Sequence, residues 1–230
     1  MITKSEFNIL AKNLDLSSQD SWSKDYWIKH KDRYFNNILL IDKYCSGTKI
    51  LEIGSYPFHQ TLLLKKMNYN ITGFDLNPER QMQFITDNEL NIIKNNIEND
   101  VIPFENNTFD YVIMTQTLQA IYYPEKLLTE MTRVGHEAIV TFPNMAHWKC
   151  RIQMALGGHM PKSKTLPYEW YNTPNIHLCS LDDFENLCAK KNIEILERAT
   201  VDHAHQISLG MNIFPNLLGE IAIYRFCSKK

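Results

Sequence analysis

The sequence predicts an α/β fold with a doubly wound, mostly parallel sheet, an antiparallel edge and a long insertion after the fifth strand. Short apolar runs alternate with helical stretches from residue 49 to residue 142, which is typical of βαβ units. Right-handed crossovers then place helices on both faces of the sheet. The alternation stops at residue 143 and strand-like runs return only near residue 193.

The first 46 residues are expected to be helical. Trp27, Tyr34, Ile38 and Ile41 recur at spacings of three, four or seven, which is one apolar face of a helix. We therefore expect an N-terminal helical cap at residues 1–46, followed by a main domain at residues 47–230.

Five short apolar runs are the expected parallel strands, at 49–53, 71–75, 91–94, 109–114 and 137–142. Helices are expected between them at 61–67, after an Asn77 cap with Pro78 at the first helical position, and at 124–134. Ser180 and Asp183 resemble a capping box that begins a helix ending near residue 191. Residues 193–200 and 219–226 complete the sheet as an antiparallel edge.

Residues 143–179 form a long, aromatic-rich segment in which only 148–156 has a helical pattern. Loops of this length are uncommon unless they are functional, so we expect a substrate-covering insertion. Tyr168, Trp170 and Tyr171 either wall a substrate pocket or pack this segment onto the sheet.

The charge and composition of the chain indicate which partners, metal sites and compartments to expect. The chain has 230 residues and a net charge of −2, so nucleic acid is not an expected partner. Five cysteines without a Cys-x-x-Cys motif favour neither a disulfide framework nor a zinc site, and the pair His203 and His205 lacks a third metal ligand. We see no signal peptide and no apolar run of membrane-spanning length, so a reduced, cytoplasmic protein is expected.

Polar residues follow three successive predicted strands. Glu52 and Gly54 stand at the exit of the first strand, Asp75 ends the second, and Asn96 and Ile97 follow the third. Ligands of such sheets bind beyond the carboxyl ends of the strands. A carboxylate there can bind both hydroxyls of a ribose, and a glycine lets the backbone approach a ligand closely. The pattern predicts a nucleoside-containing cofactor, whereas the missing G-x-G-x-x-G argues against NAD.

The layout LEIG…GFDLNPE…FDYVIMTQTLQ resembles class I S-adenosylmethionine-dependent methyltransferases. The second half is similar to the methionine-biosynthesis MetW group, most specifically in LPYEWYNTPNIH and NLLGE. The resemblance covers roughly residues 49–225 and implies a Rossmann-like fold that binds S-adenosylmethionine and releases S-adenosylhomocysteine.

The resemblance also implies the cofactor contacts. Glu52 and Gly54 would lie under the methionine and ribose, Asp75 would bind the ribose hydroxyls, and Leu76 would pack on the adenine. Asn96 and Ile97 would bind the adenine edge. The remaining expected contacts are Ile53, Ser55 and Tyr56 in the first loop, and Thr115, Gln116 and Thr117 at the methionine end.

One loop departs from the family pattern. Tyr56 and Phe58 stand where the second and third glycines of the first loop are usual, and Asn96 replaces an aspartate. Glycines there permit positive φ angles and close approach to a ligand. Either Tyr56 closes over the methionine portion and the cofactor still binds, or the site is degenerate.

The expected activity is methyl transfer to a small-molecule acceptor, at oxygen. His147 and His177 are the candidate bases, although each could instead bond a loop carbonyl. Arg33 of the N-terminal helix either meets the cofactor's carboxylate or is simply solvated. The competing hypothesis is a MetW-like regulatory partner of an acyltransferase with a degenerate cofactor site; a homo-oligomer is also open.

Overall fold

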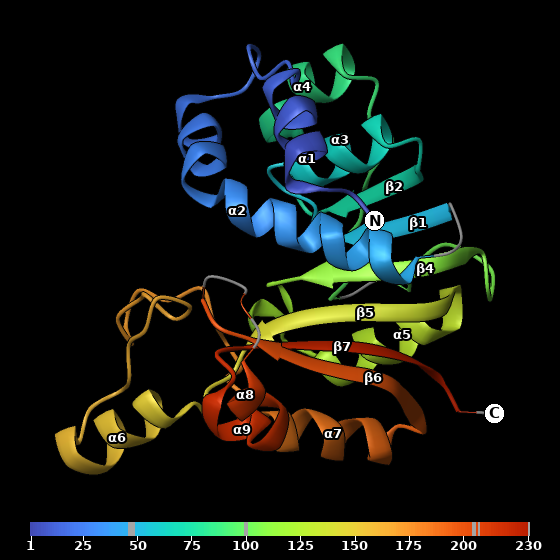
Figure 1. The fold of residues 1–230 in the computed structure, drawn as a ribbon. Coiled ribbons are helices and arrows are strands. Elements are labelled where there is room, and N and C mark those ends of the chain that lie inside the picture. Colours follow the sequence, from blue (N-terminus) through green and yellow to red (C-terminus); the bar gives the residue numbers. More distant parts are fainter. Residues whose placement is uncertain (46–48, 99–100, 204–205, 207, 230) are drawn as a thin grey trace. The chain divides into compact units, whose positions relative to one another are not determined.

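The computed structural model describes residues 1–45, 49–98, 101–203, 206 and 208–229 (Figure 1). Within them, seven strands form a mixed sheet in the order β3-β2-β1-β4-β5-β7-β6, which confirms the α/β class. The chain divides into two compact units. The first is Met1–Ile113 with Val134–His136, and the second is Met114–Arg133 with Glu137–Lys230.

The first unit holds the parallel strands. β1 (Lys49–Ile53) pairs in parallel with β2 (Asn70–Asp75) and with β4 (Phe109–Thr115), which continues into the second unit. β2 also pairs in parallel with β3 (Ile92–Lys94). This pairing places the exits of β1, β2 and β3 at the same edge of the sheet, as the sequence predicts.

Two N-terminal helices confirm the helical expectation for the start of the chain. They are α1 (Lys4–Lys12) and α2 (Ser21–Tyr44), and the predicted apolar face of α2 is buried. α3 (His59–Lys66) follows the first strand and lies beside α2 (Figure 1). The expected boundary between residues 46 and 47 lies outside the described residues, and the division into cap and domain stays a prediction.

The helix after β2 differs from its prediction. The chain forms a short 3-10 turn, Pro78–Gln81, before α4 (Met82–Asp87), and the Asn77 side chain caps neither. The Asn77 backbone N–H instead donates to the Asp75 carboxylate at 2.9 Å. Asn77 is thus the N-cap residue of the 3-10 turn and Pro78 begins it, as predicted, but the capping bond of the Asn77 side chain is absent.

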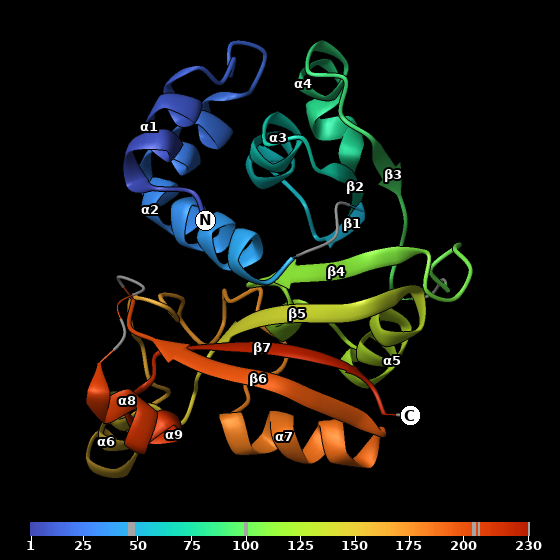
Figure 2. The same ribbon diagram turned by 45° about the vertical axis from the view of Figure 1, so that its right-hand side comes forward.

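The second unit carries the antiparallel pairing (Figure 2). β7 (Ile221–Ser228) pairs antiparallel with both β5 (Gly135–Pro143) and β6 (Ile193–Val201). α7 (Leu181–Lys190) packs along β6, and its predicted capping box is present, with Asp183 N donating to Ser180 Oγ at 3.1 Å. The other elements are the 3-10 turn Leu118–Ala120, α5 (Pro124–Val134), α6 (Trp148–Gly157), α8 (Leu209–Ile213) and α9 (Pro215–Leu218).

No helix among the described residues is long and apolar enough to span a membrane.

Candidate functional site

Asp75 joins three loops at the carboxyl edge of the first unit's strands. Its Oδ2 accepts a hydrogen bond from Tyr56 N at 3.2 Å, and its Oδ1 accepts one from Asn77 N at 2.9 Å. Its carbonyl accepts a third from Asn95 N at 3.1 Å. A carboxylate oxygen can accept two hydrogen bonds, so each oxygen of Asp75 keeps one acceptor position for a ligand.

The loop after β1, residues 54–58, is called here the β1 loop. Gly54 has a φ of 70°, and the N–H groups of Gly54 and Ser55 both donate to Phe74 O, at 2.9 and 3.2 Å. Ser55 packs on Gly73 of β2, where a Cβ would come within 2.9 Å of Ser55 Oγ. A glycine in the neighbouring strand therefore makes room for this loop.

Phe58 shows how the loop tolerates the loss of a glycine. Its φ is 69°, in the left-handed region that glycine would adopt most easily. The strain of such a residue is about 1 kcal/mol, whereas burying a phenylalanine ring contributes roughly 2–3 kcal/mol. The ring is fully buried in a cluster with Leu62, Phe84, Ile85 and Leu90. The positive φ expected of a glycine is thus retained by an aromatic residue anchored in the core.

Tyr56 faces the N-terminal helix. Its ring stacks on Trp22 with centroids 5.6 Å apart, and Trp22 stacks in turn on Tyr26 at 4.9 Å. The Tyr56 hydroxyl lies 3.5 Å from Ser23 Oγ. The side chain that replaces the second glycine therefore links the β1 loop to the start of α2.

Glu52 is buried below the loop with two polar partners that sequence reasoning did not single out. Gln60 Nε2 donates to its Oε1 at 2.8 Å, and Thr61 Oγ1 donates to its Oε2. Burial raises the pKa of Glu52 to about 7, against the lowering effect of these hydrogen bonds. Both oxygens are engaged by α3, so Glu52 fastens this helix to β1. Two adjacent polar residues eight and nine positions after the acid were the available signal.

His59 extends this buried polar network. Burial, followed by the charge of Arg33, lowers its pKa to about 3, so the ring is neutral at pH 7. Nε2 therefore donates to Gln19 Oε1 at 2.6 Å and Nδ1 accepts from the Tyr34 hydroxyl at 3.2 Å. Gln19 Nε2 also donates to Pro57 O at 2.9 Å, which ties the segment before α2 to the β1 loop.

The residues predicted for the adenine side also lie at this edge. Leu76, directly after Asp75, is 52% exposed. Asn96 and Ile97 are half-buried after β3, and Asn96 Oδ1 accepts from Glu98 N at 3.1 Å. An apolar side chain, an amide and an acid with vacant acceptor positions suit the adenine and ribose of a nucleoside cofactor.

In the second unit, the exit of β4 is linked to the long segment. Gln116 has a φ of 55°, and its N–H donates to Thr141 O at 2.9 Å, while Thr117 Oγ1 donates to Thr115 O. Gln119 Nε2 donates to Gln116 O at 2.8 Å. The Gln119 carbonyl accepts from the N–H groups of Ile176 and His177, at 2.7 and 3.0 Å. The structure thus brings His177 together with Thr115, Gln116 and Thr117.

The two candidate bases have different surroundings. His177 is exposed, and its Nε2 bonds Tyr122 O at 3.1 Å. His147 is buried at the start of α6, where burial lowers its pKa while the charge of Glu220 opposes the shift.

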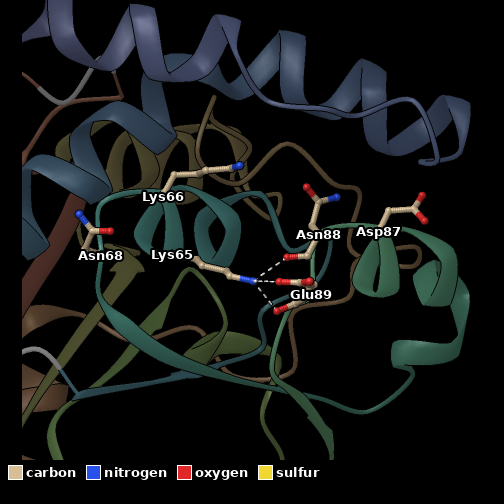
Figure 3. A pocket seen from close by; sticks show the side chains of 6 residues that line it. All are labelled: Lys65, Lys66, Asn68, Asp87, Asn88 and Glu89. Atoms are coloured by element: carbon tan, nitrogen blue, oxygen red, sulfur yellow. Dashed lines mark hydrogen bonds and ion pairs between the residues drawn. The ribbon is translucent and has the colours of Figure 1, made fainter.

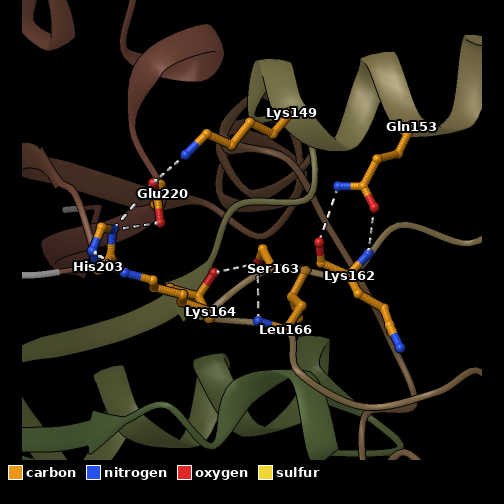
Figure 4. Close-up of polar contacts among 9 residues, drawn as sticks. Lys149, Gln153, Lys162, Ser163, Lys164, Leu166, His203 and Glu220 are labelled. Carbon is orange, nitrogen blue, oxygen red and sulfur yellow. Dashed lines mark hydrogen bonds and ion pairs between the residues drawn. The ribbon is translucent and has the colours of Figure 1, made fainter.

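Glu220, whose charge acts on His147, lies in a second polar cluster. Figure 4 shows this cluster with Lys149, Lys164 and His203. Its carboxylate is 3.3 Å from His203 Nδ1 and 3.7 Å from Lys149 Nζ, and Lys164 Nζ is 3.1 Å from His203 Nε2. Asn144 Nδ2 donates to Asn216 O and Gly219 O, both at 2.9 Å. The NLLGE motif therefore holds the turn after β5 in place.

The aromatic residues of the long segment lie on its surface. Trp170 is 74% exposed and Tyr171 is 71% exposed, so these two rings do not pack the segment onto the sheet. The segment is held by hydrogen bonds near in sequence, such as those of the Gln153 side-chain amide with the N–H and carbonyl of Lys162 (Figure 4), and by the bonds of Ile176 and His177 to Gln119 and Tyr122. A role as a substrate wall stays a prediction.

A polar hollow of about 320 Å³ lies at the other end of α3 (Figure 3). Lys65 Nζ there donates to the carbonyls of Asn88 and Glu89, just after α4, at 2.8 and 2.6 Å. A lysine that bonds the last carbonyls of a helix is a structural cap. Among the described residues no cluster of histidine, cysteine or acidic side chains could hold a metal, and His205 lies outside them.

Comparison with known proteins relates this geometry to a family. The sequence model of a family described as methionine biosynthesis protein MetW matches residues 35–226. A bifunctional methionine biosynthesis protein MetXA/MetW from Rhodopirellula baltica is 33% identical over 140 residues. That match spans 60% of this chain but 22% of the length of the relative.

Solved structures of methyltransferases share the fold. A Thermotoga maritima S-adenosylmethionine-dependent methyltransferase, a possible histamine N-methyltransferase, has a TM-score of 0.60 at 16% identity, covering 97% of this chain and 99% of that one. Magnesium protoporphyrin IX methyltransferase from Synechocystis, with S-adenosylhomocysteine bound, has a TM-score of 0.56 at 10% identity, covering 97% and 93%. At these identities the likeness shows the fold alone.

Proposed function

This chain belongs to the MetW family, and we propose that it is an S-adenosylmethionine-dependent methyltransferase that acts on an oxygen of a small-molecule acceptor. The observation that carries the proposal is Asp75. Its carboxylate ends β2, is oriented by two backbone N–H groups, and retains an acceptor position on each oxygen for the two hydroxyls of a ribose.

Each predicted contact then has a chemical role. Asp75 binds the ribose, Leu76 covers one face of the adenine, and Asn96 with Ile97 recognises its edge. The methyl group leaves a sulfonium, so the cofactor itself supplies the electrophile. The protein's part is to align the acceptor and exclude water, which accounts for much of the acceleration in such reactions. Thr115, Gln116 and Thr117 are assigned to the methionine end.

His177 is our first choice for the base. A carbonyl only accepts hydrogen bonds, so Nε2 carries the proton that it donates to Tyr122 O, and Nδ1 keeps a lone pair. Nδ1 can therefore take a proton from an acceptor hydroxyl. His147 is the second choice, because its lowered pKa keeps it neutral at pH 7. Replacing the true base by alanine should lower turnover by about 10²–10⁴-fold and leave cofactor affinity intact.

Calorimetric titration with S-adenosylmethionine and S-adenosylhomocysteine tests the cofactor site. We expect micromolar binding by the wild type and a loss of at least tenfold in Asp75→Asn, because one acceptor oxygen becomes a donor amide. Asp87→Asn is the matched control, since the Asp87 side chain is exposed at the end of α4 and accepts a hydrogen bond from Gln83. A wild type that binds neither ligand would contradict the proposal.

The second candidate is a regulatory partner of an acyltransferase. The bifunctional relative, whose name joins MetXA to MetW, favours it, as does the apolar surface of the second unit, where Ile152, Leu156, Leu209 and Ile213 are exposed. Co-purification of a stoichiometric acyltransferase together with no cofactor binding would support this candidate. Clear cofactor binding by a chain that purifies alone would favour the enzyme.

A further inference from the structure

Arg33 of α2 carries a charge that no described acid neutralises. Its side chain is half-buried, its Nε is fully buried without a hydrogen-bond partner, and no described carboxylate forms an ion pair with it. Burying a cation is unfavourable unless an anion or a set of acceptors compensates for the lost water. We therefore looked for the anion that this guanidinium would bind when the protein is functional.

Aromatic rings frame the guanidinium. Its central carbon lies 5.1 Å from the centroid of the Tyr26 ring and 5.6 Å from that of Tyr34, and one terminal nitrogen donates to the Tyr26 hydroxyl. Such rings hold a cation in orientation without neutralising it. The neighbouring histidines are neutral at pH 7: the pKa of His30 is lowered to about 4 by burial and then by Arg33, and that of His59 to about 3.

Two chains of contacts connect this framed cation to the β1 loop. On one side, Tyr26 stacks on Trp22, which stacks on Tyr56. On the other, the Tyr34 hydroxyl bonds His59, and His59 bonds Gln19, whose amide bonds the carbonyl of Pro57. Two adjacent residues of the loop, Tyr56 and Pro57, are therefore linked to the two tyrosines that hold Arg33.

We infer that Arg33, held between Tyr26 and Tyr34, binds the carboxylate at the amino-acid end of the cofactor. The inference rests on the proposed function, because that function supplies the ligand. A guanidinium presents paired donors in a plane that match a carboxylate, which a single ammonium group does not. The tyrosine frame supplies the orientation, and the missing acid leaves the donors for the ligand.

Two ligands that differ in this carboxylate test the inference. S-adenosylhomocysteine carries it, whereas 5′-methylthioadenosine has the same adenosine and sulfur without the amino-acid portion. We expect Arg33→Met to lower the affinity for S-adenosylhomocysteine tenfold or more and to change the affinity for 5′-methylthioadenosine by less than twofold. Arg33→Lys should recover part of the loss. Lys29→Met removes the same charge from an exposed position of α2 and should change neither affinity.

The outcomes separate this inference from the proposed function. If Arg33→Met binds S-adenosylhomocysteine as tightly as the wild type does, the inference is overturned and the methyltransferase proposal stands. An equal loss of affinity for both ligands also overturns the inference, because Arg33 would then act by stabilising the fold. The far-ultraviolet circular dichroism spectrum and the melting temperature of the variant are measured beside the titration. A wild type that binds neither ligand overturns both.

Discussion

The β1 loop and the long segment after β5 both carry predicted site residues, yet they are built in opposite ways. The β1 loop is anchored by fully buried side chains, Phe58 and His59, and by bonds to α2, β2 and the chain before α2. The long segment is held by hydrogen bonds, some of them local, such as Ser163 with Leu166, and some to Gln119 and Tyr122, and it exposes Trp170 and Tyr171. The proposed cofactor side is thus anchored by buried side chains, and the proposed acceptor side by hydrogen bonds of exposed residues.

The two regions should differ most in how much stability is lost when an aromatic side chain is replaced by alanine. Phe58→Ala should lower the free energy of unfolding by about 3–5 kcal/mol, because it leaves a cavity among Leu62, Phe84 and Leu90. Tyr171→Ala should change it by less than about 0.5 kcal/mol, since its ring is exposed. Denaturant unfolding of both variants checks this. Equal losses would show that the long segment belongs to the core.

Glu52, which is buried below the β1 loop, makes the free energy of unfolding depend on pH. Its pKa rises from 4.5 to about 7 on folding, so the folded state holds the proton more tightly. The stabilisation from this proton is complete below pH 4.5 and is lost as the pH rises through 7. Glu52→Gln should therefore gain stability relative to wild type by up to about 3 kcal/mol between pH 4.5 and pH 8. Melting curves of the variant and the wild type across this pH range check the prediction. If the Glu52 carboxylate instead stays charged in the folded protein, the difference in stability between the two would not change with pH.

Two glycine-to-alanine substitutions separate steric crowding from backbone strain, one in β2 beside the β1 loop and one in the long segment. Gly73→Ala should cost about 1–3 kcal/mol, because its Cβ would lie 2.6 Å from Ile92 Cδ1 and 2.9 Å from Ser55 Oγ. Gly158→Ala, at the end of α6, should cost about 1 kcal/mol from its φ of +65° alone, since nothing lies within 4 Å of the new Cβ. Only Gly73→Ala should also weaken S-adenosylhomocysteine binding; an unchanged affinity would separate Ser55 from the site.

A smaller effect is predicted at Ser180, which directly follows the long segment. Ser180→Ala removes the cap of α7 and should lower the free energy of unfolding by about 1 kcal/mol. Cofactor affinity should be unchanged, because the cap is a contact within one helical turn. Ser180→Asp, which can restore the cap, is the control, and a loss in that variant would point to a role of the hydroxyl beyond capping.

The sequence by itself determined the order of the strands and helices, the position of Asp75 at the end of β2, and the capping box at Ser180. These features depend on apolar periodicity and on side chains within a few residues of each other, which are visible along the chain. Asn77 occupies the predicted cap position, but its side chain makes no capping bond.

Only the tertiary structure decided what surrounds those residues. The positive φ of Phe58 depends on its burial among side chains of α3 and α4. The neutral state of His59 depends on burial and on the charge of Arg33, and its hydrogen-bond partners Gln19 and Tyr34 are forty and twenty-five positions away in sequence. The missing acid beside Arg33 is likewise a property of its three-dimensional neighbours. Burial and hydrogen-bond partnership join residues far apart in the chain, so local sequence patterns cannot specify them.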